Sequence, residues 1–178
     1  MESIRSFHSD LKLVKELIYE KCNFNLKNPK LDTESVEYGA CTFELDGKKI
    51  EHRVSKITLT KNGQFVTIWK RNQDGITESF DIADEIDFIF ITARSGDHFG
   101  QFIFSKRILA DNGIISQNGK SGKRGIRVYP PWDKPKSKQA EKTQNWQLNF
   151  FLTIKTDGST DIFWAKKLFA AILKTLFG

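Results

Sequence analysis

The segment Ile86-Asp-Phe-Ile-Phe-Ile-Thr92 decides the fold class. After Asp87 it is apolar until Thr92, so neither side of an extended chain would face water. Strands of this kind lie in the middle of a sheet and are covered on both faces. The sequence therefore predicts a central buried strand here, and the rest of the chain must supply its neighbours and the covering layers.

Strand patterns lie on both sides of this segment. Cys41–Leu45 and Lys48–Val54 flank Asp46-Gly47, a dipeptide typical of a tight hairpin because both residues tolerate a positive φ. In Gln64–Lys70 the apolar residues alternate, which is typical of a half-buried strand. The other segments predicted to be extended are Lys56–Thr60, Gly100–Phe104, Gly125–Tyr129 and Trp146–Ile154.

Apolar residues recur at helical spacing near both ends of the chain. The first stripe predicts a helix over Ser9–Asn23, and the second predicts a closing helix that begins at Ile162. Asn23–Glu34 is polar and contains Pro29, which indicates a connector. The stripes are Phe7, Leu11, Val14, Ile18 and Cys22, and Ile162, Ala165, Phe169, Ile172 and Leu176.

Two short helices are expected between these ends. Ser105 to Asn112 precedes Gly113, a residue typical of the position just past a helix end. Lys138–Asn145 follows Ser137, a good N-cap. The order of elements predicts one domain over residues 1–178 with an α+β fold in three layers, in which helices flank a central mixed sheet.

Composition limits the class of protein. The chain of 178 residues is 39% hydrophobic and 12% aromatic, which excludes a disordered protein. Its two cysteines, Cys22 and Cys41, form no disulfide framework and are expected to be free thiols. The N-terminus lacks a signal-peptide core, and lysines interrupt the apolar segment Ile162–Phe177. We expect a cytoplasmic protein that does not enter a membrane.

The stretch from Gly119 to Trp146 carries the basicity of the chain. Residues 117–138 hold seven cations and one acid, Asp133, and this surplus of six equals the net charge of the whole chain. Glycines and the rings of Tyr129 and Trp132 stand among the cations, which favours a nucleic acid as partner. A solvated loop of ordinary lysines is the alternative. The cations are Lys120, Lys123, Arg124, Arg127, Lys134, Lys136 and Lys138.

Further cations lie at predicted strand ends. If these ends converge, they would extend the basic stretch into a groove for several phosphates, with Lys56 and Lys106 as the strongest candidates. Strand-edge cations also deter aggregation, which is the alternative. Trp132 is a candidate platform for a base, whereas Trp146 is expected in the core. The remaining cations of this set are Arg53, Lys61, Lys70 and Arg71.

A group of carboxylates just before the central strand suggests a metal-dependent nuclease. Asp84 or Asp87 would hold Mg²⁺ and Lys106 would steady the attacking water. The acid normally found two residues before the lysine is missing, because that position is Phe104. Helix capping or solvation of Asp84 and Asp87 is the alternative. Glu51-His52-Arg53 resembles an acid-x-lysine pattern, with arginine in the place of lysine.

Other common sites are not indicated. Gly119-Lys120-Ser121 matches the end of a phosphate-binding loop, but Ile114 stands where that motif needs its first glycine. The three histidines share no metal-ligand spacing with the cysteines. The chain has no Gly-x-Ser-x-Gly segment.

Several segments of the chain resemble the MepB family. They are Gly100-Gln-Phe-Ile-Phe-Ser-Lys106, Gly122-Lys-Arg-Gly-Ile-Arg-Val-Tyr-Pro-Pro-Trp132, Gln144-x-Trp146, and Arg53-x-x-Lys56-x-Thr58-x-x-Lys61 continued by Gly-Gln-Phe-Val-Thr-x-Trp-Lys-Arg71. The similarity extends from Tyr38 to Phe151.

The resemblance implies a cytoplasmic bacterial protein whose gene often lies beside a multidrug efflux pump. It also implies a restriction-endonuclease-like fold that binds DNA. The matching residues would be Arg53, Lys56, Lys61, Lys70, Arg71, Lys106, Lys123, Arg124, Arg127, Tyr129 and Trp132.

Three functions remain open from the sequence. The first is a DNA-binding protein without catalysis, for which RNA is also an open partner. The second is a Mg²⁺-dependent nuclease with a displaced acid, acid-x-lysine signature that uses Asp84 or Asp87. The third is an accessory protein of an efflux system that binds small cationic drugs or a protein partner.

Overall fold

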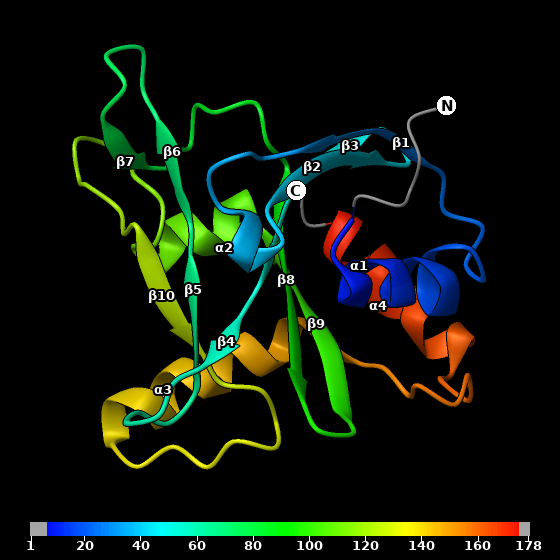
Figure 1. The fold of residues 1–178 in the computed structure, drawn as a ribbon. Coiled ribbons are helices and arrows are strands. Elements are labelled where there is room, and N and C mark those ends of the chain that lie inside the picture. The colour runs from blue at the N-terminus through cyan, green and yellow to red at the C-terminus, as the bar shows by residue number, and fades with distance from the viewer. Residues whose placement is uncertain (1–6, 175–178) are drawn as a thin grey trace.

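A computed structural model describes residues 7–174, with side chains as far as residue 171. Six strands form a central sheet in the order β1-β2-β3-β8-β9-β11 (Figure 1). The pair β3 and β8 is parallel and the other pairs are antiparallel, so the sheet is mixed, as predicted. The strands are β1 (Leu26–Leu31), β2 (Cys41–Leu45), β3 (Lys48–Val54), β8 (Phe88–Ser95), β9 (His98–Ser105) and β11 (Phe151–Thr153).

Strand β8 lies inside the sheet and is covered on both faces, which confirms the prediction for this segment. Phe88 and Phe90 belong to one apolar cluster, whereas Ile89 and Ile91 belong to the cluster on the other side. All four side chains are at most 2% exposed. The two clusters define the two covering layers of the fold.

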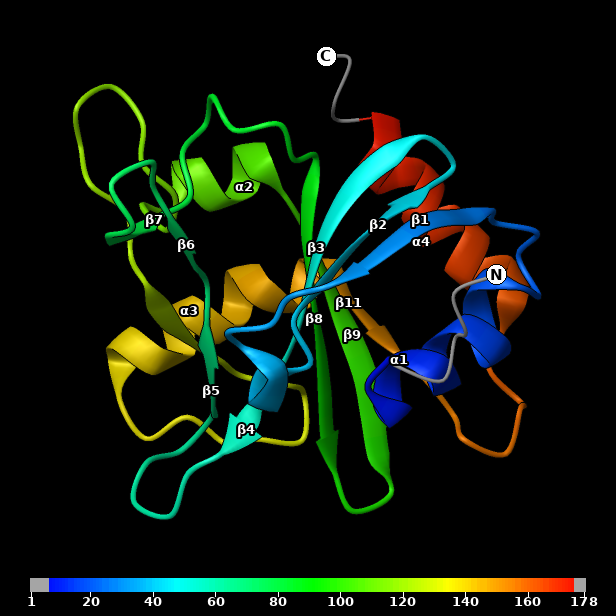
Figure 2. The same ribbon diagram turned by 45° about the horizontal axis from the view of Figure 1, so that its top comes forward.

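Helices near the two chain ends form the first covering layer (Figure 2). Helix α1 (Ser9–Val14) continues as a π-helical segment (Lys15–Tyr19), and α4 (Ile162–Lys174) packs beside it. The predicted N-terminal stripe is buried over its whole length. In α4, Ala165 and Phe169 are buried as expected, and Ile162 is partly buried. The side chain of Ile172 and the residue Leu176 lie outside the described part.

A small sheet and two helices form the opposite layer. Strands β10, β5 and β4 make this sheet in that order, and Val66 and Val128 pack from it onto the central sheet. The α2 and α3 predictions are confirmed, including the cap by Ser137, and the structure adds a cap of α2 by Ser105. The bounds are β4 (Lys56–Ile57), β5 (Gln64–Thr67), β10 (Gly125–Val128), α2 (Lys106–Asp111) and α3 (Lys138–Gln147).

The remaining elements are short. Strands β6 (Trp69–Arg71) and β7 (Thr77–Ser79) form a separate hairpin beside the small sheet (Figure 1). Two 3₁₀ turns span Val36–Tyr38 and Leu148–Phe150. Among residues 7–174, no helix has the length and apolar character to cross a bilayer.

The prediction of a connector over Asn23–Glu34 was wrong, because β1 lies within it. Pro29 argued against a strand, since proline cannot donate to a ladder. It is tolerated because β1 is the edge of the sheet and its register with β2 is interrupted between Lys27 and Lys30. Asn28 has a φ of 53° at this bulge, where the chain bends.

The prediction of a strand over Trp146–Ile154 was also wrong for most of its length. Helix α3 continues through Gln147, a 3₁₀ turn follows, and β11 has three residues. Trp146, at the end of the helix, and Leu148 and Phe150, in the turn, each pack against the core from a different element. Their spacing of two residues therefore resembles a strand without forming one. Trp146 still packs against the core, with its ring 5.2 Å from that of Phe104.

Two other strand predictions were too long. In the segment Lys56–Thr60 only the first two residues form β4. The segment Gln64–Lys70 is divided between β5 and β6. The division falls at Ile68, which pairs its backbone N–H with Arg124 O.

A chain of buried polar groups crosses the first layer and the sheet. The Tyr19 hydroxyl donates to Gln101 Oε1 (2.6 Å), and Gln101 Nε2 donates to Thr92 Oγ1 (3.0 Å). Thr92 Oγ1 lies 2.8 Å from His52 Nε2, and His52 Nδ1 lies 3.1 Å from Gly39 O. Since a carbonyl can only accept, Nδ1 carries the hydrogen and Nε2 accepts from Thr92. His52 is therefore held in one neutral tautomer.

Candidate nucleic-acid interface

A groove of about 690 Å³ opens between the small sheet and α3. Its lining includes four cations, Lys61, Lys123, Arg127 and Lys142, and no carboxylate. Aromatic residues Phe65, Tyr129 and Trp146 also line it. We call this feature the basic groove. Cations beside aromatic rings, with no acid among the lining, are the composition expected of a nucleic-acid surface.

The paired strands β5 and β10 form one wall of the basic groove. Their alternate residues Val66 and Val128 face the core, so Phe65 and Arg127, which lie opposite each other in the register, face outward. Gly125 leaves room for the Phe65 ring, because a Cβ there would lie 2.7 Å from Phe65 Cζ. This wall therefore presents an aromatic ring beside a guanidinium group.

Backbone carbonyls and a hydroxyl hold the guanidinium of Arg127. Nη1 donates to Asn62 O (3.1 Å) and Gly63 O (3.4 Å), and Nη2 donates to Thr58 Oγ1 (2.8 Å). Gly63 has a φ of 75°, and a Cβ at this position would lie 2.6 Å from Cε1 of Tyr129. The glycine thus lets the Tyr129 ring lie against the turn. Among the described residues no carboxylate pairs with Arg127, so no acid balances its charge.

Helix α3 forms the opposite wall. Gln139, Lys142, Thr143 and Trp146 line the groove at the spacing of one helix face. Lys142 lies outside residues 117–138, the part of the stretch whose cations were counted, and the sequence pattern did not single it out. The signal was present, because a helix over Lys138–Asn145 with Trp146 turned toward the core places Lys142 and Trp146 on the same face.

Two glutamines fasten the segment after β10 to α3. The Gln147 side chain is 1% exposed, accepts from Tyr129 N (2.8 Å) and donates to Arg127 O (3.0 Å). Gln144 Nε2 donates to Pro130 O (3.0 Å) and Asp133 O (2.9 Å). The two walls therefore keep a fixed spacing without a third strand.

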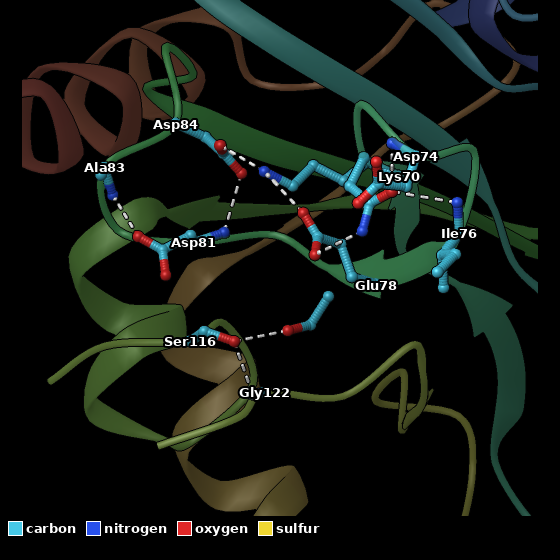
Figure 3. Close-up of polar contacts among 11 residues, drawn as sticks. Lys70, Asp74, Ile76, Glu78, Asp81, Ala83, Asp84, Ser116 and Gly122 are labelled. Atoms are coloured by element: carbon cyan, nitrogen blue, oxygen red, sulfur yellow. Dashed lines mark hydrogen bonds and ion pairs between the residues drawn. The ribbon is translucent and has the colours of Figure 1, made fainter. Parts of the chain in front are cut away.

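The loop between α2 and β10 returns tightly to its own start. Gly122 N donates to Ser116 Oγ (2.8 Å), as Figure 3 shows, and Lys123 N donates to Ile114 O (2.8 Å). A Cβ at Gly122 would lie 2.4 Å from Ile114 O, so only glycine fits there. This closure places Lys123 at the groove.

The cations of the basic stretch have no acidic partner in the part of the chain that the structure describes. Most of the cations at strand ends, in contrast, form ion pairs with acids. Lys56 pairs with Glu37 and lies over the Tyr38 ring, and Arg71 pairs with Glu34. The ion-paired cations carry less positive potential than those of the stretch. Among the predicted interface cations and the groove lysines, those without a carboxylate partner in the described residues are Lys61, Lys106, Lys120, Lys123, Arg124, Arg127, Lys134, Lys136, Lys138 and Lys142.

Lys70 is also neutralised. Its ammonium lies between the carboxylates of Asp84 (2.5 Å) and Glu78 (3.5 Å), as Figure 3 shows. Burial lowers the pKa of Lys70, but hydrogen bonding and attraction from Asp84 and Glu78 outweigh it, so the pKa is raised. Lys70 therefore balances two acids and is not among the free cations of the groove.

Arg53 lies in the interior, which conflicts with its predicted place at a phosphate. The residue is 2% exposed, and Nη1 donates to Glu51 Oε2 (3.1 Å) and His52 O (2.9 Å). Burial raises the pKa of Glu51, and the Arg53 charge opposes that rise. We therefore assign Arg53 to the interior ion pair and leave it out of the proposed interface.

Trp132 does not offer a free ring face at the groove. Its ring stacks on His98 (centroids 5.2 Å apart, planes at 13°) and meets Phe151 edge-on at 5.7 Å. Its other contacts are with the second apolar cluster. Since His98 covers one face and Trp132 is outside the groove lining, Tyr129 and Phe65 are the better candidates for stacking.

The proposed nuclease residues lie near one another, but their polar atoms have other partners. Asp84 Oδ1 pairs with Lys70, and Oδ2 accepts from Asp81 N (2.8 Å), as Figure 3 shows. Lys106 Nζ donates to the backbone carbonyl of Asp84 (3.1 Å), and Asp87 Oδ2 accepts from Lys49 N (2.8 Å). The catalytic and metal-binding roles of Asp84, Asp87 and Lys106 stay predictions. Within residues 7–171, no cluster of three His, Cys, Asp or Glu side chains is placed to hold a metal.

The last of the predicted interface residues are exposed. Lys120, Arg124, Lys136 and Lys138 lie on the basic stretch, and Arg124 Nη1 donates to Thr77 Oγ1 (3.3 Å). Lys136 and Lys138 adjoin the N-terminus of α3, where the helix dipole is also positive. They add to the positive potential near one end of the groove.

Comparison with known proteins gives the family. A family model described as MepB-like matches residues 32–153. A crystal structure of MepB has 28% sequence identity and a TM-score of 0.71, covering 82% of this chain and 97% of that chain. A bacterial homing endonuclease, I-Ssp6803I, has 10% identity and a TM-score of 0.45, covering 83% and 93%. A similarity as low as the latter carries no argument. A search of curated proteins gave no match.

The matched region contains the features described above. It includes the small sheet, the basic stretch, α2, α3 and all the residues of the basic groove. The resemblance stated from the sequence is therefore confirmed. Because the match spans more than half of its residues, this chain belongs to the MepB-like family.

Proposed function

We propose that this protein binds DNA through the basic groove. The observation that carries the proposal is the lining of that groove, which holds four cations and no carboxylate. Lys61, Lys123, Arg127 and Lys142 would contact phosphates, since each neutralised phosphate releases a condensed counterion. The MepB resemblance implies a restriction-endonuclease-like fold that binds DNA, and this expectation agrees with the proposal.

The geometry also suggests how the contacts divide. Arg127 is fixed by its three hydrogen bonds and would set the position of the backbone, whereas the exposed lysines can follow it. Tyr129 and Phe65 offer rings beside these cations for contact with sugar or base. No contact of this set reads base identity, so we expect weak sequence preference.

Removing one groove cation should weaken binding to a duplex. We expect Lys142→Ala to lower affinity by roughly five- to tenfold at about 0.1 M salt, the effect of one lost phosphate contact. Fluorescence anisotropy with a labelled duplex of random sequence measures this change. The same titration with single-stranded DNA and with double-stranded RNA identifies the preferred nucleic acid.

Lys167→Ala is the matched control. Lys167 is an exposed lysine of α4, and α4 covers the opposite face of the central sheet from the basic groove. This variant should bind as the wild type does. Equal losses from Lys142→Ala and Lys167→Ala would show non-specific attraction to net charge, and absence of binding by the wild type would refute the proposal.

A further inference from the structure

The loop between β4 and β5 exposes an apolar side chain beside the basic groove. Leu59 has a relative exposure of 104%, and Ile57, two residues earlier, is 63% exposed. Figure 2 shows this loop projecting from the body of the molecule. An isolated exposed leucine needs no explanation by itself. The position and the anchoring of this one suggest a role.

The base of the loop is firmly held. Arg127 bonds to Thr58, Asn62 and Gly63, and Asn62 Nδ2 donates to Lys134 O. Asn62 Oδ1 also accepts from Gly63 N (2.7 Å). Leu59 therefore stands at the tip of a braced turn, and little conformational freedom would be lost when it enters a partner.

The loop is also part of the groove wall. Lys61, two residues after Leu59, lines the groove with Arg127, the residue that braces the turn. A duplex whose phosphates contact these two cations would meet the tip of the loop. Proteins that bind the minor groove of DNA frequently insert an exposed apolar side chain between base pairs and bend the duplex there.

Another exposed aliphatic residue provides a contrast. Ile76 is 62% exposed in the turn between β6 and β7. Its neighbours in that turn and hairpin include the carboxylates of Asp74 and Glu78, as Figure 3 shows. The cations of this hairpin, Lys70 and Arg71, pair with Glu78 and Glu34, whereas Lys61 and Arg127 beside Leu59 have no carboxylate partner among the described residues. Ile76 therefore matches Leu59 in chemistry but not in surroundings.

We propose that Leu59 is a wedge that enters the base stack of a duplex held in the basic groove. The protein would then favour duplexes in which stacking is already weakened, such as those with a mismatch or a single-nucleotide bulge, because less stacking is lost on insertion. This inference rests on the proposed DNA binding and adds the class of duplex that the groove selects.

The test compares two duplexes that differ in one central base pair, one fully paired and one mismatched. Each carries 2-aminopurine next to that pair, whose fluorescence rises when it leaves the stack. The wild type should bind the mismatched duplex roughly tenfold more tightly and raise the fluorescence. Leu59→Ala should bind both duplexes with similar affinity and leave the fluorescence low, and Ile76→Ala should behave as the wild type does.

The outcomes separate the two proposals. If the wild type binds both duplexes equally, without a fluorescence change, and Leu59→Ala does the same, the wedge is refuted while binding in the groove stands. If the wild type binds neither duplex, both proposals fail. Thermal unfolding of Leu59→Ala and Ile76→Ala checks that these surface substitutions leave the fold intact.

Discussion

Acidification from about pH 6.5 to pH 4.5 should lower the free energy of unfolding by roughly 2 to 3 kcal/mol through His52 alone. Burial lowers the pKa of His52 from 6.5 to about 3, and the neighbouring Arg53 charge acts in the same direction. His52 of the unfolded chain therefore takes up a proton near pH 6.5, whereas His52 of the folded protein takes it up only near pH 3. The stability that neutral His52 contributes is thus fully present above pH 6.5 and is lost as the pH falls from 6.5 toward 3.

Urea unfolding of the wild type and of His52→Gln at several pH values measures this contribution. Other groups titrate in both proteins, including Glu51, whose raised pKa acts in the opposite direction. The difference between the two curves isolates His52 and should change by about 1.4 kcal/mol per pH unit.

Two results would contradict this account. One is a pair of parallel curves for the wild type and His52→Gln. The other comes from NMR of the wild-type protein, which needs no variant: if the His52 ring titrates near pH 6, it is not held neutral by burial.

Removal of the Arg53 side chain should destabilise the fold by about 3 to 5 kcal/mol. Arg53→Met would leave the Glu51 carboxylate, whose side chain is 16% exposed, without its cationic partner. The double variant Arg53→Met/Glu51→Leu should recover most of this loss, since an apolar pair can replace a buried ion pair at little cost. Chemical denaturation of the three proteins gives these free energies.

Arg71→Met is the matched control. Arg71 forms an ion pair with Glu34 at the surface, with both side chains more than 40% exposed, and its loss should cost less than about 1 kcal/mol. The same variants distinguish the buried role of Arg53 from its predicted phosphate contact. An Arg53→Met protein of wild-type stability but weak DNA affinity would restore Arg53 to the interface.

Local patterns predicted much of the fold. The two-sided apolar run at β8, the Asp46-Gly47 hairpin and the capped helices α2 and α3 depend on neighbours in the sequence, and all are confirmed. Asp46 and Gly47 both have positive φ, at 49° and 80°. These features needed no knowledge of distant contacts.

The failures depend on contacts that are distant in the sequence. Strand β1 exists because an edge tolerates Pro29, and an edge is defined only by the order of the whole sheet. The side chains of α3 past Asn145 alternate like a strand, but Gln147 bonds to β10 and holds the helix there. No local pattern distinguishes these cases.

The residues of the candidate site show the same contrast between local patterns and distant contacts. The basic stretch and Tyr129 were found from composition, because their cations lie together in the chain. The neutralisation of Lys56, Lys70 and Arg71 came from acids that only the fold brings near. Lys142 was missed for the opposite reason, since it joins the groove through the face of α3 and not through the charge run.

The central claim is that the cations of the basic groove, and not the net charge of the chain, hold the nucleic acid. The most direct test is the slope of log affinity against log salt concentration for a duplex. Four groove cations predict a slope of about −3 to −4 for the wild type, and Lys61→Ala/Lys123→Ala/Lys142→Ala should reduce it to about −1.

The control removes the same number of charges from the far side of the central sheet. Lys21→Ala/Lys166→Ala/Lys167→Ala should keep the slope of the wild type, since none of these exposed lysines lines the groove. A flat line for the wild type, or equal slopes for the two triple variants, would contradict the claim.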